Sequence, residues 1–576
     1  MKITLEKILE FHDLFPEAKS LDIRSILKKY SKEHLVRSSH VLSNNYGKAY
    51  IPDNNNTFFS KVSEKYMNIL NARFEALFSS KNYSRVCYCT PKTALELMRF
   101  VFDIPINEYQ NNGNDEDFEY DLFRVILQIN ENLTSFKHCQ KLDLATLSFF
   151  SFYVMNDIVI RDITDTFIKQ VQYYSLLSDF IEQNEDCKKA KDLFFEKAGI
   201  TNMNQYSKTW LALFYLSYKY QEQKLKECPI LDLTELKDTD KTLTHSVLDF
   251  LSIDINSHIA YDSKEDKSRD NNVDYRFFRA RPLIKIAPQK YIIYNLHILT
   301  ERLYNSLFFD LKDGFDDPFN FYNTNFVERI LFQSQIVKCI NFKRKYTIFP
   351  SYDNIHKSIK MKEKANQPDF YIREGDCLII FECKAIRLNG ELKDNADIDT
   401  LLSTMKNKLF LSKENIDKSR KEKKEERVGV TQLVHHMENI YKDEFEWDKE
   451  IPENVAYYPV LILEDSRLTA PGISYIINSW YKPLIRQKLP GQMCLPIVVM
   501  SLNTLLTYSY AFKIRGFHSI FDEYFKKTTK FLNNGTTWEF NQMGDFDTYI
   551  QENYKIRKSE KNKMFKDAIK SLVGRG

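Results

Sequence analysis

Three charged residues in the carboxyl-terminal half have the types and the spacing needed for metal-dependent phosphodiester chemistry. Asp369 follows a proline, and Glu382 and Lys384 lie two residues apart at the end of a later apolar stretch. Two carboxylates can hold a hard cation such as Mg²⁺, which neutralises a phosphodiester and lowers the pKa of a bound water. A lysine beside them can orient that water and stabilise the charge that develops on the phosphate.

Two neighbouring strands must bring these residues together. Residues 377–386 begin with apolar side chains on both alternating faces, which is typical of a central strand buried on both sides. Glu382 and Lys384 then point to the same face. A short turn containing glycine joins this strand to a preceding strand at 369–373, so a hairpin would place Asp369 beside Glu382.

The same residues allow a second interpretation. Isolated charges at the end of a buried strand are costly unless they bind a cation or pair with one another. Lys384 could therefore form an ion pair with Glu382 or Asp369 that only stabilises the end of the hairpin. The chain has 82 Lys and Arg and 79 Asp and Glu residues, so this residue pattern also arises by chance. The strand context favours the metal site.

The surrounding elements alternate between helices and strands. This order predicts an α/β sheet covered by helices. From about residue 320 onward, the expected order is a helix at 325–338, strands at 345–350, 369–373 and 377–386, a helix at 429–441, a strand at 458–463, a helix at 474–487 and a strand at 495–502. Residues 390–427 are charged and expected to be partly helical, with a solvated helix face at 413–427.

These motifs carry a resemblance to a known family. The Pro-Asp pair ending at Asp369, followed by Glu382-Cys383-Lys384, resembles the PD-(D/E)XK signature of the restriction-endonuclease-like nuclease superfamily. The resemblance covers about residues 320–505 and implies an αβββαβ core. It implies that Asp369 and Glu382 bind metal, that the main chain of Cys383 is a further ligand, and that Lys384 assists the attacking water.

The resemblance also implies contributions from two helices. Glu328 matches a glutamate that many members carry on the first core helix, as an additional metal ligand. Gln432 matches a catalytic polar residue on the helix after the lysine strand. The exonuclease-like branch has a tyrosine four residues after that glutamine, whereas this chain has His436. His435 and His436 could contact phosphate or act as a base, or they could be structural.

The function implied by this resemblance is Mg²⁺- or Mn²⁺-dependent endonuclease activity on DNA, in bacterial antiviral defence or restriction. Oxygen ligands favour either of these ions over Zn²⁺. A nuclease for RNA or for a particular nucleic-acid structure, with the same centre, is one alternative. A non-catalytic nucleic-acid-binding or scaffold protein on the same fold is another. Cleavage of both strands usually needs two such centres, so we expect a homodimer, or a partner subunit bound through the amino-terminal helices.

The length of 576 residues predicts roughly two to four domains. We expect a mainly helical region at 1–265, with a role in recognition, regulation or partner binding. A β-hairpin and helix at 266–319 would connect it to the nuclease domain at 320–510. A helical, basic tail at 511–576 would complete the chain.

The amino-terminal region shows apolar residues at helical spacing. Thr90 and Pro91 are typical of an N-cap and a first helical position. The expected helices lie at 3–11, 58–78, 91–102, 118–133, 142–180 and 209–220. A hairpin is then expected at 282–287 and 291–294, followed by a helix at 296–311.

The formal net charge of +3 excludes a uniformly basic protein, so any nucleic-acid-binding surface must be local. One candidate is the tail, which could equally be a solvated terminal helix. Its basic residues are Lys555, Arg557, Lys558, Lys561, Lys563, Lys566 and Lys570.

The cysteine pattern and the hydropathy predict a cytoplasmic protein that does not enter a membrane. The nine cysteines are scattered without zinc-finger spacing, which favours a reducing compartment. The longest apolar run, at 144–155, is too short to cross a bilayer, and the charged start of the chain does not fit a secretory signal.

Overall fold

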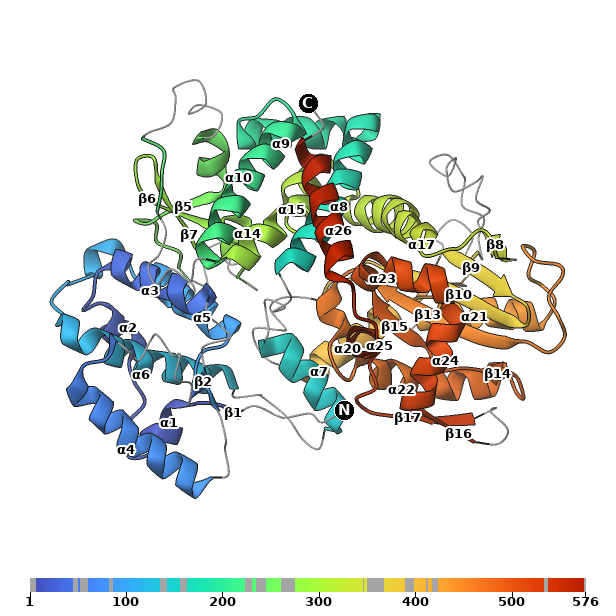
Figure 1. Cartoon of the computed structure of the whole chain (residues 1–576), viewed down its shortest axis with the longest axis horizontal. Helices are drawn as coiled ribbons and strands as arrows, with labels where there is room; N and C mark the ends of the chain where they lie inside the picture. Colours follow the sequence, from blue (N-terminus) through green and yellow to red (C-terminus); the bar gives the residue numbers. More distant parts are fainter. Residues whose placement is uncertain are drawn as a thin grey trace.

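A computed structural model of the chain shows a mixed α/β protein in which a helical amino-terminal half is followed by a large sheet with helices on both faces (Figure 1). The described residues are 7–44, 50–51, 61–81, 86–134, 142–155, 163–222, 230–234, 245–260, 275–344, 346–349, 367–388, 398–410, 413–416, 423–532 and 537–573.

The described residues begin with a strand at residue 7, so the helix predicted at 3–11 is wrong for residues 7–10, and residues 3–6 lie outside the described residues. β1 (Lys7–Ile8) pairs in parallel with β3 (Val86–Cys87), and the Leu9 N–H donates to the carbonyl oxygen of Cys87 at 2.7 Å. These bonds hold the backbone in an extended conformation. The first helix, α1 (Phe11–Leu14), therefore begins only where the expected helix should have ended.

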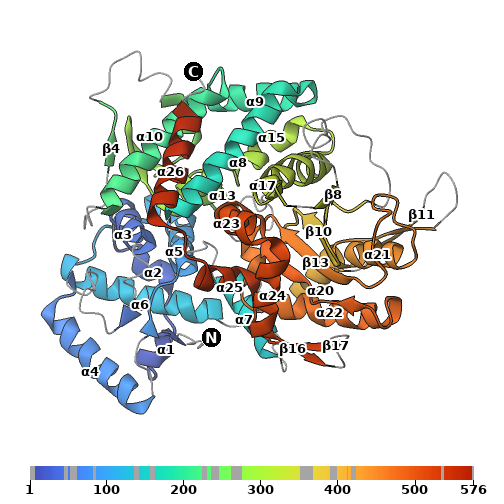
Figure 2. The ribbon, with the colours of Figure 1, turned by 45° about the vertical axis from the view of Figure 1, so that its right-hand side comes forward.

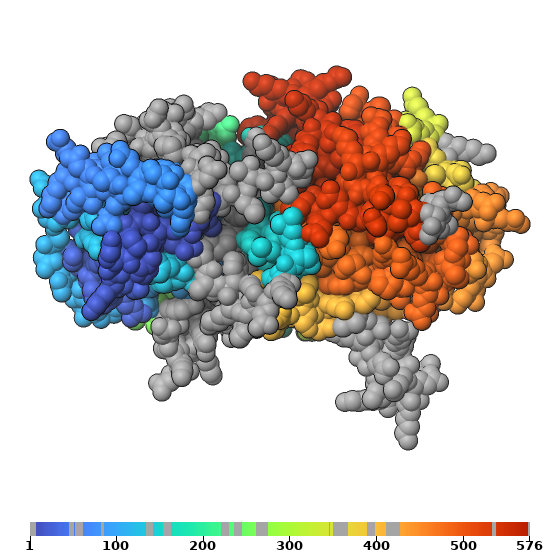
Figure 3. Space-filling model, turned by 90° about the horizontal axis from the view of Figure 1, so that it is seen from below, coloured from blue at the N-terminus to red at the C-terminus, as the bar shows by residue number. Residues whose placement is uncertain are grey.

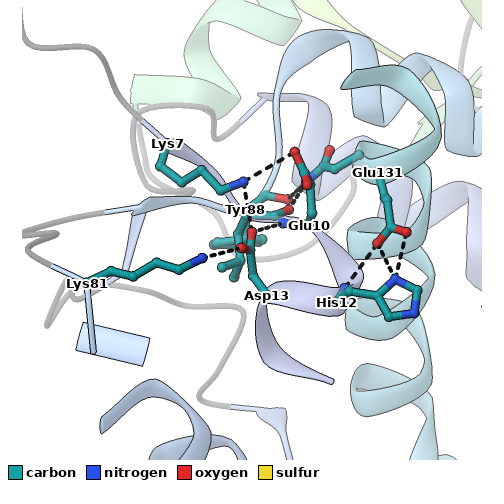
Figure 4. Close-up of polar contacts among 9 residues, drawn as sticks. Lys7, Glu10, His12, Asp13, Lys81, Tyr88 and Glu131 are labelled. Atoms are coloured by element: carbon teal, nitrogen blue, oxygen red, sulfur yellow. Dashed lines mark hydrogen bonds and ion pairs between the residues drawn. The ribbon is translucent and has the colours of Figure 1, made fainter. Parts of the chain in front are cut away.

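Ion pairs fix the start of α1 against the neighbouring elements (Figure 4). The Asp13 carboxylate lies 3.0 Å from the Lys7 ammonium and 3.3 Å from that of Lys81. Nδ1 of His12 lies 2.7 Å from Oε1 of Glu131. Lys7 and Glu131 come from segments far apart in the sequence, so these contacts tie the first strand and a later helix to α1.

The remaining helices of this half follow the predicted pattern. Helices predicted at 91–102, 118–133 and 209–220 are confirmed, and the Thr90 hydroxyl accepts from the Thr93 N–H at 3.1 Å as the predicted cap. The helices are α2 (Ile23–Leu27), α3 (Lys32–Asn44), α4 (Glu64–Ser80), α5 (Pro91–Asp103), α6 (Asp115–Thr134), α7 (Leu144–Met155), α8 (Ile163–Gln183), α9 (Lys188–Ala198) and α10 (Met203–Glu222). The predicted helix at 142–180 thus corresponds to α7 and α8, and residues 156–162 between them lie outside the described residues.

The predicted hairpin is confirmed, but it belongs to a larger sheet. The four strands, in the order β4-β7-β6-β5, are β4 (Ile230–Asp232), β7 (Lys290–Ile293), β6 (Leu283–Ala287) and β5 (Ser252–Asp254). Ile253, Ile284 and Ile292 of this sheet share a hydrophobic core with α1 to α6. Three short helices precede or follow the hairpin: α13 (Arg276–Ala280), α14 (Leu296–Arg302) and α15 (Leu307–Leu311).

The large sheet has the strand order β14-β13-β10-β9-β8, and β15 also pairs with β13. β8 and β10 each pair with β9 in antiparallel fashion, whereas β13 runs parallel to β10. The strands are β8 (Thr347–Phe349), β9 (Phe370–Glu374), β10 (Cys377–Lys384), β13 (Ala456–Leu463), β14 (Met493–Cys494) and β15 (Val498–Ser501). The strands predicted at 369–373, 377–386 and 458–463 are confirmed.

Helices cover both faces of this sheet, as the apolar run in β10 predicts. Ile379 and Phe381 pack on one face, against the π-helix η7 (Phe321–Phe332) and α24. Leu378 and Ile380 pack on the other face, against α7, α20, α21 and α22. The sheet helices not yet bounded are α17 (Gln333–Lys338), α20 (Ile398–Leu409), α21 (Val430–Tyr441), α22 (Ile473–Lys488), α23 (Leu502–Arg515) and α24 (Phe517–Thr528).

The helix α7 joins the two halves of the chain. Figure 3, seen from below, shows α7 (cyan) between the amino-terminal helices (blue) and the carboxyl-terminal half (orange and red). Phe149, Phe150 and Tyr153 of α7 belong to the core beneath β10. A helix from the amino-terminal half therefore completes one face of the large sheet.

The predicted helix face at 413–427 is wrong for residues 413–416 and 423–427, and residues 417–422 lie outside the described residues. β11 (Lys413–Ile416) and β12 (Lys423–Glu426) form an antiparallel pair instead. The alternating charges of this segment provide no apolar stripe with which a helix could pack, and pairing between the two strands satisfies their backbone groups. The part of 390–427 that is helical is α20.

The tail contains a hairpin as well as helices. β16 (Thr529–Leu532) and β17 (Thr537–Phe540) pair, and α25 (Phe546–Asn553) and α26 (Lys558–Val573) follow. α26 buries Ala568 and Leu572 and lies along α8 (Figures 1 and 2). Among the described residues, we find no helix with the length and apolar composition needed to span a membrane.

A candidate carboxylate–lysine site at the end of strand β10

Lys384, the last residue of β10, lies next to two carboxylates. Its Nζ is 2.7 Å from Oε1 of Glu382 and 3.7 Å from Oε1 of Glu328. Glu382 is only 1 % exposed, while η7 supplies Glu328 from the neighbouring helix layer. A strand residue and a helix residue therefore converge on one ammonium group.

Asp369 is held beside this pair by the hairpin register. Phe370 of β9 pairs with Phe381 of β10, so Asp369 lies one position beyond the last pair, opposite Glu382. Oδ2 of Asp369 accepts a hydrogen bond of 2.7 Å from the backbone N–H of Cys383. The carboxylate is therefore fixed to the strand that carries Glu382 and Lys384.

The charges in this cluster influence one another strongly. Burial raises the pKa of Glu382, and the Asp369 carboxylate raises it further, against the opposing effect of Lys384. Burial alone would lower the pKa of Lys384, but Glu382, Glu328 and Asp369 outweigh it and raise that pKa. Three carboxylates influence one ammonium, so the cluster can accommodate further positive charge.

His436 adjoins the same carboxylates. It is 3 % exposed, and its Nε2 lies 3.9 Å from Oε2 of Glu382. Burial lowers the pKa of His436 to about 3, which makes the imidazole neutral at physiological pH. Its Nδ1 is buried, and no hydrogen-bond partner for it is found within the described residues. The sequence allows His436 to contact phosphate, to act as a base or to be structural. Its spacing of one helical turn from Gln432 is the signal that relates it to the site.

The side chains of Gln432 and Cys383 lie outside the cluster of charged residues around Lys384. Oε1 of Gln432 accepts from the N–H of Gly429 at 2.8 Å and thereby caps α21. The side chain of Cys383 is fully buried on the opposite face of the sheet. Asp369, Glu382, Lys384 and Glu328 are thus brought together, whereas the Gln432 oxygen is engaged at the start of its helix.

Neither the arrangement of the side chains nor a comparison with known proteins identifies a bound metal. Within the described ranges, no group of three or more His, Cys, Asp and Glu side chains has an arrangement that would hold a metal ion. No protein-family model matches the sequence, and no curated protein or solved structure was found to be similar to it.

Proposed function

We propose that this protein is a Mg²⁺- or Mn²⁺-dependent nuclease of the PD-(D/E)XK type that cleaves DNA internally. The observation that carries this proposal is the meeting of Asp369, Glu382 and Lys384 at the end of one hairpin. The order of helix, three strands, helix and strand around them supports it, because it is the order that the family resemblance implies.

The donor set suits a hard divalent cation. Asp369, Glu382 and Glu328 offer only carboxylate oxygens, which Mg²⁺ and Mn²⁺ prefer. Burial of Glu382 makes its ionised form costly, and a cation would offset that cost. Asp369 and Glu382 would be the principal ligands, with Glu328 and the main chain of Cys383 as further candidates.

When bound, the cation supplies charge neutralisation at the phosphate and lowers the pKa of a water ligand. The protein's own groups then have separate roles. Lys384 holds a positive charge where negative charge develops on the phosphate and can orient the attacking water. Asp369 keeps its position through its bond from the Cys383 N–H. The imidazole of His436 stays neutral beside Glu382 and therefore adds no charge to the cluster.

DNA is the favoured substrate, with RNA or a structured nucleic acid as the alternative for the same centre. The site residues act on the phosphodiester, whereas the sugar is distinguished by surrounding surfaces. A role in bacterial antiviral defence or restriction rests on the family resemblance alone. Cleavage of both strands would need two centres, so we propose a homodimer or a second subunit for that reaction.

One observation favours a second, non-catalytic function. The Lys384 ammonium is 2.7 Å from Glu382, which is the geometry of a structural ion pair at a hairpin end. In that case the fold would serve as a nucleic-acid-binding or scaffold protein. Removal of either partner would then reduce stability without abolishing any reaction.

A substrate panel tests the proposal. Supercoiled plasmid, single-stranded DNA and single-stranded RNA are incubated with the full chain in Mg²⁺, in Mn²⁺ and in EDTA. We expect plasmid cleavage in either metal and none in EDTA. Cleavage of RNA alone would establish the alternative substrate, and absence of cleavage of all three, together with absence of Mg²⁺ binding by calorimetry, would favour the scaffold function.

A further inference from the structure

A second polar site lies beside the carboxylate–lysine site. A cavity of about 500 Å³ is enclosed by α13, by residues 301–313 of the α14–α15 segment and by the residues that follow β10 and β13. Pockets of this volume hold nucleotide-sized ligands. The walls come from these four stretches of sequence, together with Lys169 and Phe250, and the fold brings them together.

The cavity is rich in arginine. Eight basic and five acidic side chains line it. The arginines among them are Arg276, Arg279, Arg281, Arg302, Arg387 and Arg467. A guanidinium group presents a planar set of donors that matches phosphate oxygens, so this composition favours an anionic ligand.

One of these arginines, Arg302, is only partly satisfied by its protein partners. Arg302 is 1 % exposed; its Nη2 lies 2.6 Å from Asp310, and its Nε donates to the Ala280 carbonyl oxygen at 2.8 Å. Its Nη1 is buried, and no hydrogen-bond partner is found for it in the described part of the chain. Asn305 also lines the cavity, and its Oδ1 is buried with no hydrogen-bond partner among the described residues. Buried polar atoms without partners are costly, so they indicate a ligand that would supply the missing contacts.

Aromatic rings lie beside the arginines in this cavity. The guanidinium of Arg281 lies 5.0 Å from the ring centre of Phe277, and that of Arg387 lies 4.9 Å from the ring centre of Phe309. Phe309 is 38 % exposed and lines the cavity. Aromatic faces and guanidinium planes are the surfaces on which nucleobases stack.

We infer that this cavity binds a nucleoside phosphate, with the phosphates on the arginines and the base against Phe277 or Phe309. The ligand could be a free nucleotide or one nucleotide of a nucleic-acid strand, because both present the same chemistry. This inference concerns binding and does not rest on the proposed cleavage activity.

The cavity wall is continuous with the carboxylate–lysine site. The N–H of Glu464, a lining residue, donates to the carbonyl oxygen of Lys384 at 3.1 Å. The guanidinium of Arg387 lies 5.6 Å from the ring centre of Tyr322 in η7, the helix that carries Glu328. The lining residues Glu464 and Arg387 therefore link the cavity to the strand and the helix that position the carboxylates.

The test measures binding in EDTA, so it is independent of metal and of cleavage. The full chain is titrated by calorimetry with ATP and, separately, with a single-stranded DNA hexanucleotide. The variant is Arg281→Gln combined with Lys312→Gln, because both residues are exposed lining residues whose replacement spares the buried Arg302. Lys208→Gln, at an exposed position of α10 outside the cavity, is the matched control.

We expect at least one probe to bind, with an affinity that falls about tenfold or more in the double variant and is unchanged in the control. Binding of ATP alone, or of both probes, would assign a free nucleotide, and binding of the hexanucleotide alone would assign a nucleotide of the strand. If neither probe binds, or if the double variant binds as tightly as the unaltered chain, the inference is overturned. Arg281→Lys keeps the charge but not the planar donors, and we expect it to bind more weakly than the unaltered protein.

Discussion

The backbone N–H of Cys383 donates to the carboxylate of Asp369 at 2.7 Å, across the hairpin formed by β9 and β10. Through this bond the position of Asp369 depends on the strand that carries Glu382 and Lys384. The hairpin therefore fixes the position of Asp369 relative to Glu382, the two principal ligands of the proposed cation.

Substitution of Asp369 by asparagine separates the charge of this residue from its structural role. The amide oxygen of Asp369→Asn can still accept the Cys383 N–H, so we expect the fold to persist. Loss of the carboxylate should weaken Mg²⁺ binding about tenfold or more, as measured by calorimetry. Asp376→Asn, in the exposed turn at the other end of the hairpin, is the control. Equal affinities for the two variants would remove Asp369 from the metal site.

The protonation of Glu382 should make metal binding depend on pH. Burial and Asp369 raise the pKa of Glu382, and a metal ligand must be ionised. We therefore expect the affinity for Mg²⁺ to increase as the pH rises. The affinity should level off once Glu382 is already ionised in the metal-free protein. Titrations in two buffers of different ionisation enthalpy should reveal proton release on binding. Affinity that stays constant from pH 5 to about 9, with no proton release, would contradict this account.

Two buried histidines should make the fold sensitive to acid. Burial lowers the pKa of His297 to about 4 and that of His436 to about 3. In the unfolded chain a histidine binds its proton near pH 6.5, so stability is lost as the pH falls below that value, by about 1.4 kcal/mol per pH unit for each residue. We expect His297→Gln with His436→Gln to flatten the dependence of the unfolding free energy on pH between about 6 and 4. An unchanged slope in the double variant would contradict this explanation.

Two glycines test the close approach of α7 to the sheet helices. Both Gly375 and Gly472 have positive φ, at 64° and 100°. A Cβ on Gly375 would meet nothing within 4 Å, whereas one on Gly472 would lie 2.1 Å from the carbonyl oxygen of Ala145 in α7. We expect Gly375→Ala to cost about 1 kcal/mol and Gly472→Ala about 1–3 kcal/mol more, by urea unfolding. Equal losses would show that α7 does not pack there.

The site hairpin could be predicted because its signals are local. The apolar run in β10, the charges at Glu382 and Lys384 and the turn glycine Gly375 together specify the pairing that places Asp369. The cap at Thr90 was predictable for the same reason. Such patterns depend on neighbouring residues and on the two-residue period of a strand.

Features that depend on long-range packing could not be predicted. The strand at 7–8 forms because it pairs with β3, about eighty residues away, which overrides local helix propensity. The contact between His436 and Glu382 depends on how α21 docks on the sheet. The arginine cavity joins α13 with residues after β13, and no local pattern relates those segments.

The central claim is that Lys384 and its carboxylates form a hydrolytic centre. The most direct measurement compares the rate of Mg²⁺-dependent plasmid cleavage by the unaltered chain, by Lys384→Ala and by Lys513→Ala, an exposed lysine on α23. Circular dichroism is used to check that each variant is folded. We expect Lys384→Ala to lose activity about a hundredfold or more and Lys513→Ala to retain it. Cleavage by folded Lys384→Ala at the rate of the unaltered protein would contradict the claim.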